Sequence, residues 1–255
     1  MPEITGDDEG GYILNKILEG VADIFFPRRC AVCDRVLSVN IRDICKVCEK
    51  KLVYTGQQYC LKCGRKVTDE EEYCAICKKQ EKTAYDSGRV VFVYNASMRE
   101  SISRFKYHGR KEYAAFYAKQ MEKECRDWIR QIAPDVLIPV PIHRERQRVR
   151  GYNQAEIVAQ KLGESMGILV WNDFLLRTKN TLPQKGLSRK ERMKNVGQAF
   201  SIGETAQKLY KVPNCVILID DIYTTGSTIE ACAEALRREG VRRIFFLCIS
   251  AGQQM

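Results

Sequence analysis

Eight of the twelve cysteines in this 255-residue chain stand in four Cys-x-x-Cys pairs before residue 80. The first members of the pairs recur at steps of 15, 15 and 14 residues, so the segment is an internal repeat. The pairs are Cys30/Cys33, Cys45/Cys48, Cys60/Cys63 and Cys74/Cys77. Two thiolates separated by two residues can bind one Zn²⁺ from a tight turn, and two such turns complete a tetrahedral shell of four sulfurs. The spacing therefore predicts two structural zinc sites.

Two other uses of paired cysteines are weighed against zinc. Four disulfides require an oxidising compartment, and a redox Cys-x-x-Cys is normally single and lies in a βαβ unit. Residues 1–11 contain four acidic side chains and no apolar stretch, which disfavours a secretory signal peptide and favours a cytoplasmic location. The remaining cysteines stand in apolar contexts and are expected in the core. They are Cys125, Cys215, Cys232 and Cys248.

The pairs can share metals in two ways. Sequential pairing, first with second and third with fourth, closes loops of 11 and 10 residues and gives two tandem ribbons, whereas a cross-brace interleaves the pairs. We favour sequential pairing. Because large apolar residues are few in this segment, the metals are expected to supply most of its folding free energy.

The charge divides the chain near the same place. Residues 1–80 contain 13 basic and 13 acidic residues, and the rest contains 29 basic and 19 acidic ones, so the whole formal charge of +10 lies in the second part.

Apolar residues between 13 and 25 recur at helical spacing up to Pro27, and we expect this helix to pack on the zinc module rather than enter a membrane. We predict an N-terminal amphipathic helix (1–27), a double zinc ribbon (28–82) and a larger basic domain (85–255).

Past residue 85 strands and helices alternate. Strands are predicted at 89–95, 135–141, 168–176, 216–220 and 243–250, and helices at 97–106, 111–131, 152–166 and 227–239. Such alternation is typical of an α/β fold with a mostly parallel sheet and helices on both faces.

The most informative segment is VILIDDIYTTGST, residues 216–228. Four apolar residues predict a buried strand, Asp220 and Asp221 stand at its C-terminal end, and a hydroxyl-rich loop opens a helix. In open α/β sheets, ligands bind outside the carboxyl ends of the strands. The loop can turn N–H groups and hydroxyls onto a phosphate, and the carboxylates suit ribose hydroxyls, directly or through Mg²⁺. Its residues are Thr224, Thr225, Gly226, Ser227 and Thr228.

This segment resembles the motif with which type I phosphoribosyltransferases bind phosphoribosyl pyrophosphate (PRPP). Other segments narrow the resemblance: IPVPI runs into HRERQRVRGYNQA, PQKGLSRKERMKNVGQAF follows, and Phe105, Lys106 and Tyr107 come earlier. With the four cysteine pairs ahead of them, these motifs resemble the ComF family (ComF/GntX, competence protein FC-like) from about residue 26 to residue 252. The resemblance implies a double zinc ribbon joined to a type I phosphoribosyltransferase domain, PRPP bound with Mg²⁺, and handling of single-stranded DNA together with competence proteins.

The resemblance also implies roles for individual residues. Asp220 and Asp221 are the ribose carboxylates, and Thr224 to Thr228 form the 5′-phosphate loop. The loop after Pro141 resembles the segment that meets pyrophosphate. It holds Arg144, Arg146, Arg148 and Arg150. Residues 182–195 resemble the mobile loop that closes over PRPP, where basic side chains neutralise charge on the departing pyrophosphate. They are Lys185, Arg189, Arg192 and Lys194, of which Arg189 and Arg192 join the two aspartates as candidate catalytic residues.

The acceptor of the phosphoribosyl group has weaker signals. Relatives that act on 6-oxopurines carry an aspartate where this chain has Thr224, which argues against that substrate group. His143 is a weak candidate for a general base, and a surface histidine is the favoured account of it. Tyr152 and Tyr223 are candidates either for stacking on a base or for the core.

Two functions of different classes remain open. One is an enzyme that transfers a phosphoribosyl group to a nitrogen nucleophile and releases pyrophosphate. The other is a binding protein that senses PRPP or nucleotides and contacts single-stranded DNA through its basic loops. Residues 144–150 carry four arginines and one glutamate, and residues 177–194 carry seven basic residues and one acidic one, so the same side chains suit pyrophosphate or DNA. Type I relatives commonly form homodimers, and no membrane insertion is expected.

Overall fold

The computed structural model describes residues 27–38, 41, 43–68, 70–80, 82–178, 199–203 and 211–252. The chain divides into two compact units, Met1–Lys51 and Leu52–Met255. The amphipathic helix predicted between residues 13 and 25 lies outside the described residues. Within the described part, no helix is both long enough and apolar enough to span a bilayer.

The described part of the first unit is a small ribbon. Arg29 and Val36 form an antiparallel bridge around a turn that begins at Cys30. The turn is closed by hydrogen bonds from Asp34 N to Cys30 O (2.9 Å) and from Cys30 N to Arg35 O (2.8 Å). A short helix, α2 (Lys46–Glu49), follows Cys45.

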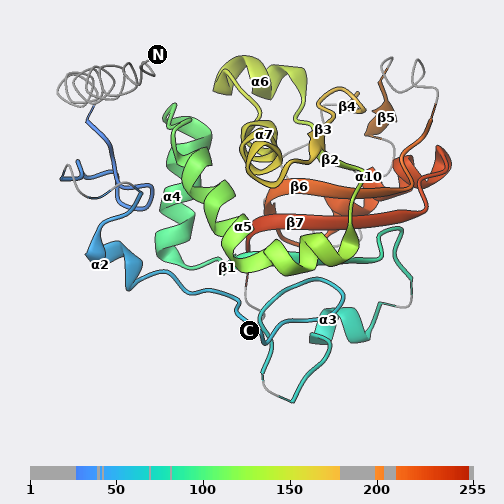
Figure 1. Cartoon of the computed structure of the whole chain (residues 1–255), viewed down its shortest axis with the longest axis horizontal. Coiled ribbons are helices and arrows are strands. Elements are labelled where there is room, and N and C mark those ends of the chain that lie inside the picture. Colours follow the sequence, from blue (N-terminus) through green and yellow to red (C-terminus); the bar gives the residue numbers. More distant parts are fainter. Residues whose placement is uncertain are drawn as a thin grey trace, which may run out of the picture. The chain divides into compact units, whose positions relative to one another are not determined.

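The second unit is built on a five-stranded parallel sheet in the order β1-β7-β6-β2-β3 (Figure 1). Its strands are β1 (Ser87–Val93), β2 (Val136–Pro139), β3 (Leu169–Val170), β6 (Cys215–Tyr223) and β7 (Arg243–Ala251). A two-stranded antiparallel sheet pairs β4 (Leu175–Arg177) with β5 (Phe200–Ile202). The predicted α/β class with a mostly parallel sheet is therefore confirmed.

Helices cover both faces of this sheet. The helices of this unit are α4 (Ala96–Tyr107), α5 (Tyr113–Ile132), α6 (Arg144–Arg150), α7 (Gln154–Met166) and α10 (Ser227–Arg238), with the short α3 (Ala75–Lys78) earlier in the chain. On one face, α10 and residues 60–77 share an apolar cluster with Val216, Leu218 and Phe246. The alternate strand residues point away from that cluster, toward the face where α5 and α7 contact the sheet and each other.

The connections reverse direction between β2 and β6. From β2 the chain passes through α7 to the outer strand β3, whereas from β6 it passes through α10 to β7 on the other side. This is a topological switch point, and the crevice outside the carboxyl ends of such strands is where open α/β sheets bind ligands. The loop after β2 and the loop after β6 both start there.

Three local predictions were wrong in detail. The arginine-rich segment after Pro141 is a helix, α6, because arginine and glutamine favour helices, His143 caps its start and Gly151 (φ 77°) ends it. The strand expected at 168–176 is split into β3 and β4 by a turn at Asn172 and Asp173, residue types that favour turns. β6 runs on to Tyr223, so both aspartates lie within the strand.

Candidate functional site

The eight paired cysteines gather in two groups of four. The first group is Cys30, Cys33, Cys45 and Cys48, and the second is Cys60, Cys63, Cys74 and Cys77. Within each group the four sulfurs lie within 4.8 Å of one another, and none of the twelve cysteines, all of them in the described part of the chain, is in a disulfide. This is sequential pairing, and four sulfurs from two tight turns fit the tetrahedral shell of a structural Zn²⁺. The chain thus has two zinc-binding sites of four cysteines each.

The candidate ligand site lies at the end of β6. Asp220 is paired with Cys248 of β7, whereas the register between β6 and β2 ends one residue earlier, at Ile219 and Pro139. The strand pairing on the β2 side of β6 therefore ends just before the two aspartates. Asp220 Oδ1 accepts a hydrogen bond from the N–H of Asp221 at 2.8 Å.

The two carboxylates have different electrostatic surroundings. Burial raises the pKa of Asp220 to about 7, and the charge of Asp221 acts in the same direction, while Lys106 and Arg177 oppose the shift. Asp221 forms an ion pair with Lys106 of α4, with 2.7 Å between Oδ2 and Nζ. The side chains of this pair are only 14% and 17% exposed, so solvent screens it weakly. Lys106, noted in the sequence only as part of a motif, is a site residue.

The hydroxyl-rich loop begins one residue beyond β6. Gly226 is the N-cap of α10 at φ 81°, and no described side chain caps that end, so the first N–H groups of α10 face the loop. Thr225 Oγ1 and Ser227 Oγ are hydrogen-bonded at 3.1 Å, and Ser227 is buried. A Cβ at Gly226 would lie 2.5 Å from the Tyr223 hydroxyl, so both the φ angle and the space require glycine. A helix N-terminus with free N–H groups and hydroxyls suits a phosphate.

Basic side chains approach the site from α6 and β4. Arg144 and Arg148 are exposed, and Arg150 hydrogen-bonds to Gln154 (3.1 Å) and to the Tyr107 hydroxyl (3.1 Å). Arg177 of β4 was not predicted as a site residue. Burial lowers its pKa, as does the charge of Arg146, while Asp220 is among the groups that raise it. Arg146 and Arg177 therefore lie close enough to interact, at a place where an anion would relieve their repulsion.

The structure does not support the two base-stacking candidates. Tyr223 is buried and stacked on Phe246, with ring centroids 4.7 Å apart. Tyr152 is buried and donates a hydrogen bond to Phe105 O. A third tyrosine, Tyr107, is 62% exposed. His143 accepts a hydrogen bond from Glu145 N as a helix cap. Lys185, Arg189, Arg192 and Lys194 lie outside the described residues.

Comparison with known proteins agrees with this description. The family model "Double zinc ribbon domain" matches residues 21–78. Competence protein F of Haemophilus influenzae is 33% identical over 224 residues, which cover 86% of this chain and 95% of that protein. This chain belongs to the ComF family. The family resemblance and the double zinc ribbon inferred from the motifs are thereby confirmed.

Other ComF relatives cover less of the chain or are less similar. Competence protein ComFC of Bacillus subtilis is 30% identical over 71% of this chain and 72% of its own length. DNA utilization protein YhgH of Escherichia coli K12 is 26% identical over 88% of this chain and 96% of its own length. The solved purine phosphoribosyltransferase from Pyrococcus horikoshii covers 54% of this chain and 84% of its own, with 14% identity and a TM-score of 0.32, too low to support an argument.

Proposed function

We propose that this ComF chain binds PRPP with Mg²⁺ at the carboxyl end of β6 and transfers its phosphoribosyl group, releasing pyrophosphate. The observation that carries the proposal is the position of Asp220 and Asp221 at the switch point of the sheet, directly before an uncapped helix N-terminus. The N–H groups and hydroxyls of Thr224 to Thr228 suit the 5′-phosphate, and the carboxylates suit the ribose hydroxyls.

The charged residues at the site suit Mg²⁺ and the pyrophosphate group of PRPP. Mg²⁺ prefers oxygen ligands and usually binds through one or two carboxylates together with substrate phosphates. Asp220 and Asp221 would hold it, and it would neutralise charge on the pyrophosphate as it leaves. Arg146 and Arg177 interact at the same site, and with Arg144, Arg148 and Arg150 they would bind the pyrophosphate and stabilise its developing charge. We assign the same role to Lys185, Arg189 and Arg192.

Calorimetric titration with PRPP tests this proposal. The wild-type chain is expected to bind PRPP in the presence of Mg²⁺ and much more weakly without it. The double variant Asp220→Asn, Asp221→Asn loses hydrogen bonds to charged groups worth about 1.5–3 kcal/mol each, so we expect binding at least about 100-fold weaker. The matched control is Asp127→Asn, Asp173→Asn, because both of these carboxylates are exposed. Equal affinity in the two double variants would reject the carboxylate assignment.

Transfer is tested separately from binding. The chain is incubated with PRPP, Mg²⁺ and a panel of bases, amines and single-stranded DNA, and pyrophosphate release is followed. Release that depends on one class of acceptor supports the transferase. Binding of PRPP without release from any acceptor supports a PRPP-binding protein instead.

Single-stranded DNA binding is a second candidate, favoured by one surface feature. Tyr107 is 62% exposed, and the Arg150 guanidinium lies 4.9 Å over its ring, so an aromatic face adjoins the basic helix α6. A base stacked on an aromatic side chain contributes about 1–3 kcal/mol. We expect Tyr107→Ala to weaken binding of a short oligonucleotide about 5-fold or more, and Tyr73→Ala, at a 40% exposed tyrosine, to leave it unchanged. Equal losses of oligonucleotide affinity in both variants would refute the assignment of Tyr107 as a DNA contact.

The names of the relatives extend the proposal to the cell. Competence protein F and DNA utilization protein YhgH suggest DNA uptake and competence proteins as the setting for this chain. We propose a cytoplasmic location, because a reducing compartment keeps the eight paired cysteines available to zinc instead of forming disulfides. We also propose a homodimer, which light scattering on the purified chain would test.

A further inference from the structure

The second cysteine group is built into the unit that carries the phosphate loop. All four of its cysteines are at most 5% exposed and belong to the apolar cluster that contains Val90, Phe246 and buried residues of α10. The turn after Cys60 meets β1 directly, because Gly88 N donates to Lys62 O at 3.0 Å. A Cβ at Gly64 would lie 2.5 Å from the Cα of Arg89, so the two backbones are in contact.

The same turn also contacts the end of β6 that leads into the phosphate loop. Arg65, the residue after Gly64, is only 7% exposed, and its guanidinium lies 5.0 Å over the ring of Tyr223. Tyr223 is the last residue of β6 and stands directly before the phosphate loop. Its ring is also stacked on Phe246 of β7, with 6° between the ring planes. The ribbon therefore helps to fix the ring that leads into the loop.

A pair of buried hydroxyls extends this contact to the loop itself. The hydroxyls of Tyr85 and Tyr223 are hydrogen-bonded at 2.9 Å, and both residues are at most 4% exposed. Burial raises the pKa of both phenols, so both stay neutral near neutral pH. The Tyr223 hydroxyl also lies against Gly226, 2.5 Å from the position of a Cβ there. Tyr85 thus holds the hydroxyl that supports the left-handed turn of the loop.

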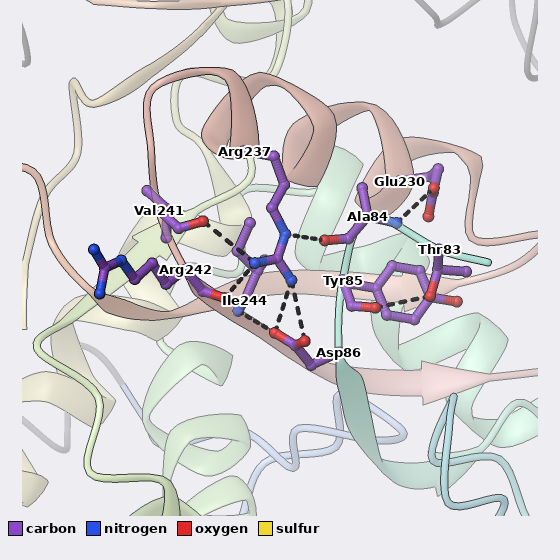
Figure 2. A network of polar contacts seen from close by, with 9 residues as sticks. All are labelled: Thr83, Ala84, Tyr85, Asp86, Glu230, Arg237, Val241, Arg242 and Ile244. Carbon is purple, nitrogen blue, oxygen red and sulfur yellow. Dashed lines mark hydrogen bonds and ion pairs between the residues drawn. The ribbon is translucent and has the colours of Figure 1, made fainter.

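The segment that carries Tyr85 is bonded to both the first and the last turn of α10 (Figure 2). Arg237 Nη2 bonds both carboxylate oxygens of Asp86 at 3.0 Å, and its Nε donates to Ala84 O at 2.8 Å. Glu230 Oε1 accepts a hydrogen bond from Ala84 N at 2.8 Å. Residues 84–86, which follow the second cysteine group in the chain, are therefore hydrogen-bonded directly to α10.

We propose that Tyr85 and Tyr223 are positioning residues for the phosphate loop, and that occupancy of that loop is thermodynamically coupled to metal retention at Cys60, Cys63, Cys74 and Cys77. The inference rests on the proposed function, because the loop is taken to bind the 5′-phosphate of PRPP. Coupling between two sites is reciprocal. A ligand bound at the loop raises the zinc affinity of the second cysteine group, and loss of that zinc lowers the affinity of the loop for its ligand.

The zinc affinity of the wild-type chain tests the coupling without any turnover. The zinc lost to a competing chromophoric chelator at equilibrium is measured with and without saturating ribose 5-phosphate, and binding of that ligand is measured by calorimetry. We expect one of the two zinc ions per chain to be bound about tenfold more tightly with ligand. Cys45→Ser, Cys48→Ser keeps only the second site and is expected to retain this effect. Its counterpart, Cys74→Ser, Cys77→Ser, is expected to lose it.

The outcomes separate the two proposals. If ribose 5-phosphate and PRPP do not bind to the wild-type chain, the proposed function fails. If ribose 5-phosphate binds and both zinc ions keep an unchanged affinity, the coupling is refuted and the proposed function stands.

A single hydroxyl deletion tests the positioning role. Tyr85→Phe leaves the Tyr223 hydroxyl without its partner, and we expect the Kd for ribose 5-phosphate to rise about tenfold. The Kd for pyrophosphate, assigned to the arginines, should change less than about twofold. Tyr54→Phe is the matched control, since its hydroxyl bonds Gln120 at 2.9 Å on another element. A merely structural role predicts lower stability in both variants and unchanged affinity, which would overturn the assignment.

Discussion

The raised pKa of Asp220 makes the free protein lose stability as the pH rises. An ordinary aspartate with a pKa of 3.8 is ionised in the unfolded chain near neutrality, whereas folded Asp220 keeps its proton up to about pH 7. Between these two values the folded state binds the additional proton, so each unit of increasing pH lowers the free energy of unfolding by up to about 1.4 kcal/mol. Above pH 7 folded Asp220 is ionised as well, so the stability that its retained proton provides is lost. Asp220→Asn removes the titration and keeps the shape.

The expected magnitude follows from those two pKa values. Between about pH 6 and pH 8.5 the wild-type chain should lose about 1.4 kcal/mol of unfolding free energy relative to Asp220→Asn. Below about pH 6 the zinc thiolates also begin to protonate, so the comparison is restricted to this window, where effects common to both chains cancel. The Asn variant should be the more stable chain at the alkaline end of the window, and its advantage should shrink toward the acidic end.

Urea unfolding of both chains at several pH values, followed by circular dichroism, measures this difference. Asp127→Asn serves as the control, because it makes the same chemical change at an exposed aspartate. A difference between wild type and Asp220→Asn that stays constant across the window would refute the raised pKa.

Further predictions concern the loop, the helix anchor and the metals. Gly226→Ala should abolish PRPP binding, because it places a Cβ 2.5 Å from the Tyr223 hydroxyl at a φ of 81°; unchanged binding would contradict this. Arg237→Gln should lower the free energy of unfolding by about 2 kcal/mol, since it removes hydrogen bonds to Ala84 and Asp86, and a loss below about 0.5 kcal/mol in urea would show that the network is weak. Mass spectrometry under native conditions should find two zinc ions per chain, and fewer would contradict the double ribbon.

The sequence predicted the elements that carry strong local signals. The Cys-x-x-Cys spacing identified both zinc groups, and the apolar run before Asp220 identified the central strand. It did not identify Arg177 as a site residue, because the electrostatic interaction of Arg177 with Asp220 arises only through the tertiary fold. Lys106 is separated from Asp221 by more than a hundred residues, so its 2.7 Å ion pair has no local signature. The sequence could not decide between base stacking and a core position for Tyr223 for the same reason: its stacking on Phe246 depends on the pairing of β6 with β7.

The antiparallel bridge between Tyr54 and Phe92 has a practical consequence for dividing this protein into pieces. Thr55 N donates to Val91 O and Val93 N donates to Val53 O, so the short segment around Tyr54 covers the outer edge of β1. A truncated chain that starts at residue 85 would leave β1 as an open edge and uncover the apolar side chains that now pack on the second cysteine group. Such a fragment is expected to aggregate. One that starts at Leu52 keeps the edge covered and should remain monodisperse.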